Sequence, residues 1–354
     1  RTAADPDGSG LELIDCGVGH SPLGTSPGVQ GALAEIRSWE LSRYPNRSYE
    51  DFLKPAILQR FAPRGVGPRD LFFGHGSFNL IERLVHKFIE PRVMLGVGPQ
   101  FTEIPSEFVA AGGVYHPIPL EGPGLDLPAD LVRAALGHLD VSLVYLDNPN
   151  NPLGRVFPLD EVRQLAHLCQ AHDALLLVDE AYADFVDDAS SAIHLVAEVD
   201  NVIVTRSFSK ALGLAAERVG YMFMSRHLSG LYREIDVPFE PGLVAAVLAD
   251  AVLADHGFLD EIRRRTTSLK EVIVGELEAA GLEVLPTHPA VSIMSVHAVK
   301  GDLVRAFRGV GVVVQAGSSF RQTQPLWDDS YCRLRVVSEE LVDELGRRIG
   351  ALRI

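Results

Sequence analysis

Short, uninterrupted apolar segments alternate with longer amphipathic segments through much of this chain. The candidate strands lie at 92–98, 142–148, 174–182, 201–207 and 218–224. Continuous hydrophobicity is typical of strands that are buried on both faces, whereas a strand with one solvated face alternates apolar and polar residues. We therefore predict an α/β domain over roughly residues 45–240, with a mainly parallel central sheet covered by helices on both sides.

The amphipathic segments between these strands carry helix signals. "SFNLIERLVHKFIE" opens on Ser77, a residue type that favours the N-cap position. "PLDEVRQLAHLCQAH" has a proline and acidic residues at its start and places Val162, Leu165 and Leu168 on one face. Both segments are expected to be helices that pack against the sheet.

The pattern changes after Pro241. A long helical segment, continuous or in two parts, ends at Gly281, and a closing helix begins after Ser338. Between them lie three short strand-like segments, "AVSIMSVH", "GVGVVVQAGSSF" and "RLRVV". We predict a smaller α+β domain over 241–354, with residues 1–44 forming an N-terminal arm and part of that small domain.

Composition excludes several kinds of partner. The 354 residues are 47% hydrophobic and 22% charged, which is typical of a globular protein. The net charge of −15 disfavours nucleic acid and anionic membranes, since both are bound by basic surfaces. No apolar run approaches the roughly 20 residues of a membrane span. One basic pocket for an anionic ligand remains compatible with this charge.

Cysteine and histidine usage bears on the cellular location of the protein and on metal binding. The three cysteines, Cys16, Cys169 and Cys332, are far apart in sequence, which favours reduced thiols and a cytoplasmic location. The twelve histidines show no zinc-binding spacing, so we expect no metal site. The N-terminal stretch "RTAADPDGSGLELID" is polar, and we expect no signal peptide in it.

Polar side chains follow several of the predicted strands at the point where each strand ends. "DNPNNPLG" (147–154), "DEAY" (179–182) and "SFSK" (207–210) come after three of them, and "GHGSFN" (74–79) leads into a helix. Ligands of open α/β sheets bind beyond the carboxyl ends of the strands. We therefore expect these segments to meet in one pocket.

Each of these features has a simple structural explanation when taken alone. Lys210 could be a surface lysine, Gly76 and Ser77 a plain helix start, and "NPNNPLG" a turn. Together they meet the needs of pyridoxal phosphate: a lysine for a Schiff base, a carboxylate for the pyridine nitrogen and donors for the phosphate. Lys210 and Asp179 supply the first two, and the phosphate donors are Gly76, Ser77, Ser207 and Arg218.

The combination "NPNNPLG … VDEAY … SFSKALGLAAERVGY" resembles the fold-type-I pyridoxal-phosphate enzymes, in particular the class I and II aminotransferases. Within these the chain is most similar to the histidinol-phosphate aminotransferases and the related threonine-phosphate decarboxylases. The similarity extends from "GHSPLG" (19–24) to "RLRVV" (333–337). It implies the large and small domains described above, a cytoplasmic homodimer with shared active sites, and transamination of an amino acid.

The resemblance also implies a role for individual residues. Lys210 would form the internal aldimine, Asp179 would pair with the pyridinium, and Asn151 and Tyr182 would contact the phenolic oxygen. Phe101 would stack on the ring. The phosphate would be held by Gly76, Ser77, Ser207, Ser209 and Arg218, with Tyr44 reaching the phosphate of the neighbouring subunit. Arg335 would bind the substrate carboxylate, with Arg333 on the same strand face as an alternative or second ligand, and His20 and Ser21 would line the substrate side.

Two departures from the family pattern concern the substrate. The asparagine-rich motif near the start of relatives reads "GHSPLG" here, and Gln315 takes the position where relatives that act on phosphorylated substrates have an arginine. A neutral amide cannot replace a charge-assisted clamp on a phosphate dianion. We therefore expect a free amino acid as substrate, with Arg321 as the alternative cation. Residues 325–332 either line the substrate entrance or form a surface loop.

Single parts of this pattern are also found in proteins of other functions. Ser207 to Lys210 spells the S-x-x-K of serine acyl-enzymes, but S-D-N and K-T-G do not occur. "GVG" (96–98) would suit a dinucleotide-binding protein, but Phe101 stands where the third glycine is needed. A non-catalytic protein that retains the fold is a third alternative. Within the cofactor's own chemistry, a lyase, a decarboxylase and a carbon–carbon-bond-forming enzyme of secondary metabolism share the same residues.

Overall fold

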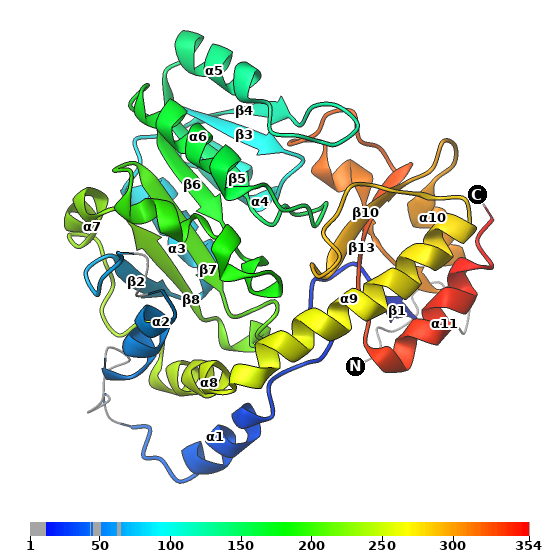
Figure 1. Ribbon diagram of the computed structural model, residues 1–354, viewed down its shortest axis with the longest axis horizontal. Helices are drawn as coiled ribbons and strands as arrows, with labels where there is room; N and C mark the ends of the chain where they lie inside the picture. The colour runs from blue at the N-terminus through cyan, green and yellow to red at the C-terminus, as the bar shows by residue number, and fades with distance from the viewer. Residues whose placement is uncertain (1–11, 43, 45–50, 62–64, 354) are drawn as a thin grey trace.

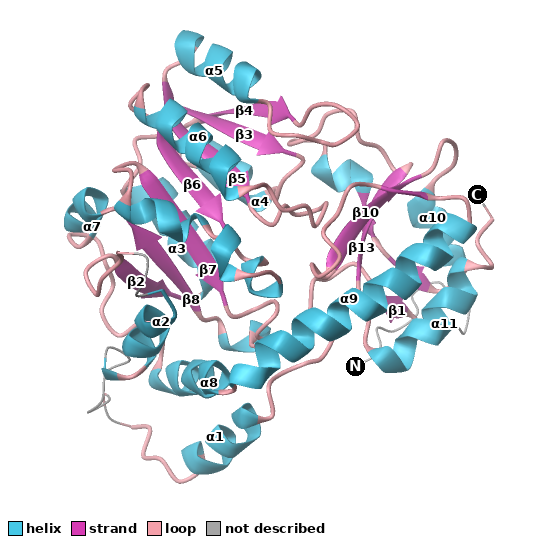
Figure 2. Cartoon of the chain, viewed as in Figure 1, coloured by secondary structure: helices cyan, strands magenta, loops and turns pink. Residues whose placement is uncertain are grey.

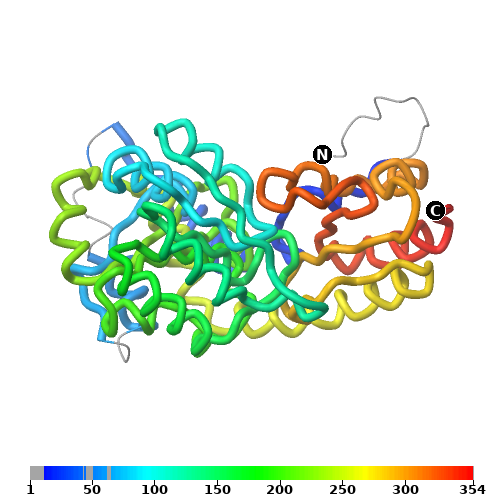
Figure 3. The backbone as a smooth tube through the Cα atoms, turned by 90° about the horizontal axis from the view of Figure 1, so that it is seen from above, coloured from blue at the N-terminus to red at the C-terminus, as the bar shows by residue number. Residues whose placement is uncertain are grey.

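The computed structural model describes residues 12–42, 44, 51–61 and 65–353 (Figure 1). Most of the N-terminal stretch in which we expect no signal peptide lies outside the described residues. The chain forms two lobes that lie side by side (Figure 3). The large lobe is built on a seven-stranded sheet and the small lobe on a four-stranded sheet.

The large sheet has the strand order β2-β8-β7-β6-β5-β3-β4. Its strands are β2 (Leu71–Gly74), β3 (Val93–Gly98), β4 (Val114–Pro119), β5 (Val141–Asp147), β6 (Leu175–Asp179), β7 (Val202–Ser207) and β8 (Gly220–Met224). Strands β4, β3, β5, β6 and β7 run parallel, and β8 pairs antiparallel with both β7 and β2. The predicted mainly parallel sheet is confirmed.

Both faces of this sheet are buried, as the apolar strands predicted. In β5, Leu143 and Tyr145 pack into one core, whereas Val144 and Leu146 pack into the other. The helices of the large lobe are α2 (Leu53–Phe61), α3 (Gly76–Lys87), α4 (Glu103–Ala110), α5 (Ala129–His138), α6 (Leu159–Gln170) and α7 (Arg226–Tyr232). Figure 2 shows these helices around the strands. A continuous apolar strand thus has a packing partner for every side chain.

Several predicted boundaries differ from the structure, three of them for a clear local reason. Ser77 is not the N-cap of α3, because the helix begins one residue earlier and His75 occupies the N-cap position. The predicted strand 174–182 ends at Asp179, since the chain turns there. The strand predicted from 218 begins at Gly220, because Arg218 takes a left-handed conformation with φ of 54°. Strands β2 and β4 were not predicted.

One long helix joins the two lobes. The long helical segment after Pro241 is divided into α8 (Leu243–Ala254) and α9 (His256–Ala279), and Gly281 with φ of 82° follows the second. Buried residues of α8 belong to the core of the large lobe. Helix α9 starts in that core and ends in the core of the small lobe, so it spans both (Figure 1). The domain boundaries that we expect at residues 44 and 240 remain predictions.

The small lobe has the strand order β12-β13-β10-β9. Its elements are β9 (Glu283–Val284), β10 (Ile293–His297), α10 (Leu303–Gly309), β11 (Val312–Val313), β12 (Gln315–Ala316), β13 (Tyr331–Arg335) and α11 (Glu339–Ile349). From the N-terminal segment, β1 (Ile14–Asp15) pairs with β11, and α1 (Gly28–Ile36) lies against α8. The 3₁₀ helices are η3 (Ala183–Phe185), η4 (Asp188–Ser190), η5 (Ala192–Ala197), η6 (Ala215–Glu217) and η7 (Gly317–Phe320).

Candidate functional site

A cavity of about 140 Å³ opens at the carboxyl ends of β5, β6 and β7, beside the start of α3. Its lining residues come from the segments that the sequence placed together: Ser77, Phe78, Phe101, Asp147, Pro149, Asn151, Asp179, Ala181, Tyr182, Ser207, Ser209, Lys210 and Arg218. The parallel strands bring their carboxyl ends to one edge, and the turns that follow carry the polar side chains.

One end of the cavity is an anion cradle. The N-cap residue His75 makes no side-chain hydrogen bond to the first turn of α3, so the backbone donors of that turn face the cavity uncapped. Arg218 donates from Nη1 to Ser209 Oγ at 3.2 Å. Gly76 has φ of 84°, and a Cβ there would lie 2.6 Å from Arg218 Nη2. Glycine at this position thus lets the guanidinium approach the helix start.

Lys210 lies in the middle of the cavity. Its Nζ donates to the carbonyl of Gly19 at 3.2 Å and lies 5.3 Å from the ring centroid of Tyr182. A Cβ on Gly19 would clash with the Tyr182 hydroxyl. The N-terminal segment therefore closes over the lysine at a position where only a glycine fits.

Asp179 is buried at the end of β6. Its Oδ1 accepts from the Ala181 backbone N–H and from the Thr205 hydroxyl, both at 3.1 Å, and its Oδ2 accepts from the Tyr145 hydroxyl at 3.3 Å. Burial raises the pKa of Asp179 to about 6, while these donors and the charge of Lys210 lower it. The carboxylate is thus held rigidly at the cavity floor.

The two candidate arginines of β13 lie in different surroundings. Arg333 is buried and donates from Nη1 to Asn151 Oδ1 at 2.8 Å, and its Nη2 donates to the carbonyl of Gly17. Arg335 is half-buried, donates to its neighbour Val336 O at 3.3 Å, and lines a separate pocket. Between these two, Arg333 is the arginine that contacts a residue lining the Lys210 cavity.

The other predicted site residues line two different pockets. Phe101 lines the cavity, with its ring edge-on to Phe78 at 6.3 Å. His20 and Ser21 line the separate pocket beside Arg335. Ser21 donates to Ala211 O at 3.4 Å, next to Lys210 in the chain.

Tyr44 is not part of the cavity. Its side chain is 80% exposed and lies 5.2 Å from the ring of Phe239. Tyr44 therefore does not contribute to the anion cradle of its own chain.

Asp147 was not singled out from the sequence, although it is buried and lines the cavity. A signal was present, because "VYLDN" and "LLVDE" each end an apolar strand in an aspartate. In the sheet Asp147 is the direct partner of Asp179.

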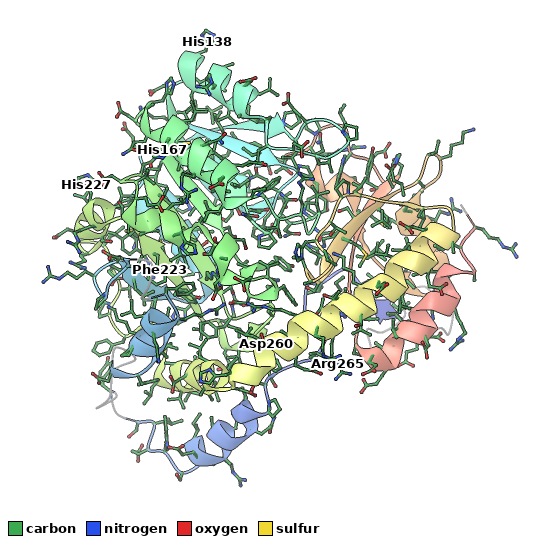
Figure 4. The ribbon with its side chains drawn as sticks, viewed as in Figure 1. His138, His167, Phe223, His227, Asp260 and Arg265 are labelled. Carbon is green, nitrogen blue, oxygen red and sulfur yellow. The ribbon has the colours of Figure 1, made fainter. Side chains whose placement is uncertain are left out.

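Histidines are scattered over the molecule. His138, His167 and His227 lie apart on separate helices of the large lobe (Figure 4). Among the described residues no group of three His, Cys, Asp or Glu side chains could hold a metal ion. Within the same ranges no helix has both the length and the apolar character needed to cross a membrane.

Comparison with known proteins assigns the family. The family model "Aminotransferase class I and II" matches residues 12–349. The chain belongs to this family. Among curated relatives, histidinol-phosphate aminotransferase of Nitrobacter winogradskyi is 30% identical over 282 residues, which are 79% of this chain and 75% of the relative. Histidinol-phosphate aminotransferase 2 of Pasteurella multocida is 28% identical, covering 85% and 83% of the two chains.

Solved structures of aminotransferases share the fold. Histidinol-phosphate aminotransferase from Sinorhizobium meliloti in complex with pyridoxal-5′-phosphate superposes with a TM-score of 0.82 at 24% identity, covering 96% of this chain and 90% of that one. Aspartate aminotransferase from Thermus thermophilus with maleate gives 0.79 at 19% identity, covering 97% and 92%. The predicted fold type and family resemblance are confirmed. The acyl-enzyme and dinucleotide alternatives are not supported.

The residues of the aminotransferase cavity fit pyridoxal phosphate. The uncapped start of α3 with Ser77, Ser207, Ser209 and Arg218 suits a phosphate dianion. A buried carboxylate, Asp179, lies in the same cavity as the amine of Lys210. The fit rests on charge and donor placement, since each charged part of the cofactor has a group of opposite charge or a donor available.

Proposed function

We propose that this aminotransferase uses pyridoxal phosphate bound through Lys210 to move the amino group of a free amino acid. The observation that supports this most directly is the convergence of Lys210, Asp179 and the anion cradle in one cavity. When bound, the cofactor supplies an electron sink for the α-carbon of the substrate. Asp179 would hold the pyridine nitrogen in its protonated form, and Phe101 would cover the ring.

Lys210 is the amine that lines the cavity and would carry the proton removed from the substrate. The Gly19 carbonyl orients its Nζ from one side, and the ring of Tyr182 lies on another. Asn151 and Tyr182 would hold the phenolic oxygen. Because the N-terminal segment covers the lysine, bulk water has restricted access to the atom that moves the proton.

We further propose that Arg333 binds the substrate α-carboxylate, rather than the Arg335 that the resemblance indicated. The support is the bond from Arg333 Nη1 to Asn151, a residue of the cavity wall. Its Nε is buried without a partner among the described residues, so the guanidinium retains an unused donor. An arginine can hold a carboxylate through two parallel hydrogen bonds.

Replacing Arg333 by lysine is expected to raise KM for the amino acid by about 100-fold, since the charge stays but the paired hydrogen bonds are lost. Arg335→Lys is the matched control on the same strand and should raise KM by less than about threefold. Steady-state kinetics of both variants against the same substrate checks this. A larger effect from Arg335→Lys would restore the role first expected for Arg335.

The surroundings of Gln315 and Arg321 do not favour a phosphorylated substrate. Gln315 pairs with Arg333 in the sheet, and its amide donates to Ser319 Oγ at 3.3 Å. Arg321 donates from Nε to the carbonyl of Trp327 at 3.3 Å. A neutral amide and an arginine engaged with a loop carbonyl form a weak clamp for a dianion.

The reaction is tested by single-turnover spectroscopy against a panel of amino acids, with the product identified by mass. A keto acid is the expected product. An amine would indicate decarboxylation, and an unsaturated or lengthened product would indicate a lyase or carbon–carbon-bond formation. A protein that stays colourless with pyridoxal phosphate would contradict the proposed cofactor.

We propose that the chain is a homodimer in which Tyr44 serves the partner's site. In support, Tyr44 and Phe239 form an exposed aromatic pair, and Tyr44 lines a broad groove with Trp39, Phe52 and Leu243. A twofold interface would cover this apolar surface. The predicted cytoplasmic location is supported by three thiols that are free and buried.

Tyr44→Ala is expected to weaken pyridoxal phosphate binding about tenfold, the worth of one hydrogen bond to a charged group. Val272→Ala, a change at an exposed residue of α9 away from this groove, should leave it unaltered. Mixing Tyr44→Ala and Lys210→Ala subunits should restore tight binding at one site of each mixed dimer. If mixing restores nothing, Tyr44 does not act across the interface.

A further inference from the structure

Two buried aspartates, rather than one, lie at the floor of the cofactor cavity. Asp147 ends β5 and Asp179 ends β6, and the two residues are direct partners in the parallel sheet. Both line the cavity. Side chains of paired residues in neighbouring parallel strands point to the same face of the sheet, so the two carboxyl groups lie next to each other.

The hydrogen bonds of Asp147 leave one of its oxygens unused. Its Oδ2 accepts from the backbone N–H of Phe101 at 2.8 Å. Its Oδ1 is buried and has no hydrogen-bond partner among the described residues. A buried anionic oxygen without a donor is costly, whereas a protonated carboxyl group carries no charge to compensate.

Among the residues that the structure describes, no lysine, arginine or histidine forms an ion pair with Asp147. The Tyr145 hydroxyl donates to Asp179 at 3.3 Å, and this hydroxyl and the backbone N–H of Asn151 act to lower the pKa of Asp147. Tyr115, from β4, faces Asp147 as well. The charge of Lys210 acts on Asp179. Burial and the neighbouring Asp179 raise the pKa of Asp147 to about 8.

We propose that Asp147 and Asp179 form a carboxyl pair that shares one proton, and that Asp147 is a positioning residue for the cofactor ring. Asp147 carries the proton and Asp179 the charge, because both oxygens of Asp179 accept hydrogen bonds whereas Oδ1 of Asp147 accepts none, and because the charge of Lys210 acts on Asp179. The pair then presents one negative charge, which matches one pyridinium nitrogen. Through the Phe101 N–H, the same aspartate also places the aromatic ring that would cover the cofactor.

Infrared spectroscopy of the full chain tests where the proton lies. Without added cofactor, the wild type should show the C=O absorption of a protonated carboxyl group near neutral pH, and Asp147→Asn should lose it. Asp70→Asn is the matched control. Asp70 is also buried, with one oxygen bonded to the backbone N–H of Gly67 and the other unpartnered, and it lies at the opposite edge of the sheet.

The stability of the same variants gives a second measurement. A proton that is bound in the folded chain and released on unfolding makes stability fall as pH rises towards the folded-state pKa. The wild type should therefore lose thermal stability between about pH 4, near the pKa of an unfolded aspartate, and about pH 8. Asp147→Asn has no proton to lose there and should lose less.

The infrared C=O absorption of the protonated carboxyl group is the decisive test of the shared proton. Its absence from the wild type, or its unchanged intensity in Asp147→Asn, would overturn the shared proton. If Asp147→Asn does not fold, the wild-type band is followed against pH: it should weaken as pH rises through about 8, and its absence at neutral pH would overturn the shared proton. The role at the ring rests on the proposed cofactor. That proposal is tested separately, by borohydride reduction of protein mixed with pyridoxal phosphate and a search for the modified peptide with Lys210.

Discussion

Replacing Lys210 by alanine is expected to reduce turnover by about four orders of magnitude, the upper range for loss of a positioned general base. The cavity should still bind pyridoxal phosphate, because the cradle of Ser77, Ser207, Ser209 and Arg218 and the carboxylate of Asp179 remain in place. Turnover is measured by steady-state kinetics and cofactor binding by fluorescence titration.

Lys87→Ala is the control for this change, since Lys87 is an exposed lysine of α3. It should retain wild-type turnover. Borohydride should fix the cofactor to the wild type and to Lys87→Ala, but not to Lys210→Ala. Turnover of Lys210→Ala near the wild-type rate would show that another group carries the proton.

Asp179→Asn is expected to lower kcat by about a thousandfold while weakening cofactor binding by less than about tenfold. The amide keeps most of the side chain's volume but cannot balance a positive charge on the pyridine nitrogen, and such electrostatic contributions are commonly of this size. Loss in kcat is measured under substrate saturation, and affinity by titration with the cofactor.

The acid limb of the pH profile provides a further check on Asp179. Because burial raises the pKa of Asp179 to about 6 in the chain without cofactor, the carboxylate should be protonated as pH falls below that value, and the affinity of the cofactor-free chain for pyridoxal phosphate should fall with it. Asp179→Asn should lack this dependence, whereas Asp70→Asn should retain it. Equal losses in kcat and affinity would contradict an electronic role for Asp179.

The cofactor end of the site was predictable from sequence because it depends on local order. A polar residue placed directly after a buried parallel strand must lie at the carboxyl edge of the sheet. Asp179, Asn151 and Ser207 meet this condition, and the structure places all three in the cavity. Gly76 with its positive φ was found for the same reason, since it joins a strand to a helix start.

The residues that would bind the substrate were harder to predict from the sequence, because their positions depend on how the lobes pack. Arg333 and Arg335 share one face of β13, so their local patterns are equivalent. The carbonyl of Gly17 and the side chain of Asn151, from two distant segments, single out Arg333. Asp147 was missed because its significance comes from its pairing with Asp179.

The sequence by itself determined the two-sided parallel sheet, the family and many of the polar residues that line the cavity, because strand hydrophobicity and the residues at strand ends act over a few positions. Only the tertiary structure decided which arginine reaches the cavity, that Gly19 covers Lys210, and that two aspartates share the floor. These contacts join residues up to 316 positions apart, and their geometry is set by sheet register and lobe packing rather than by local pattern.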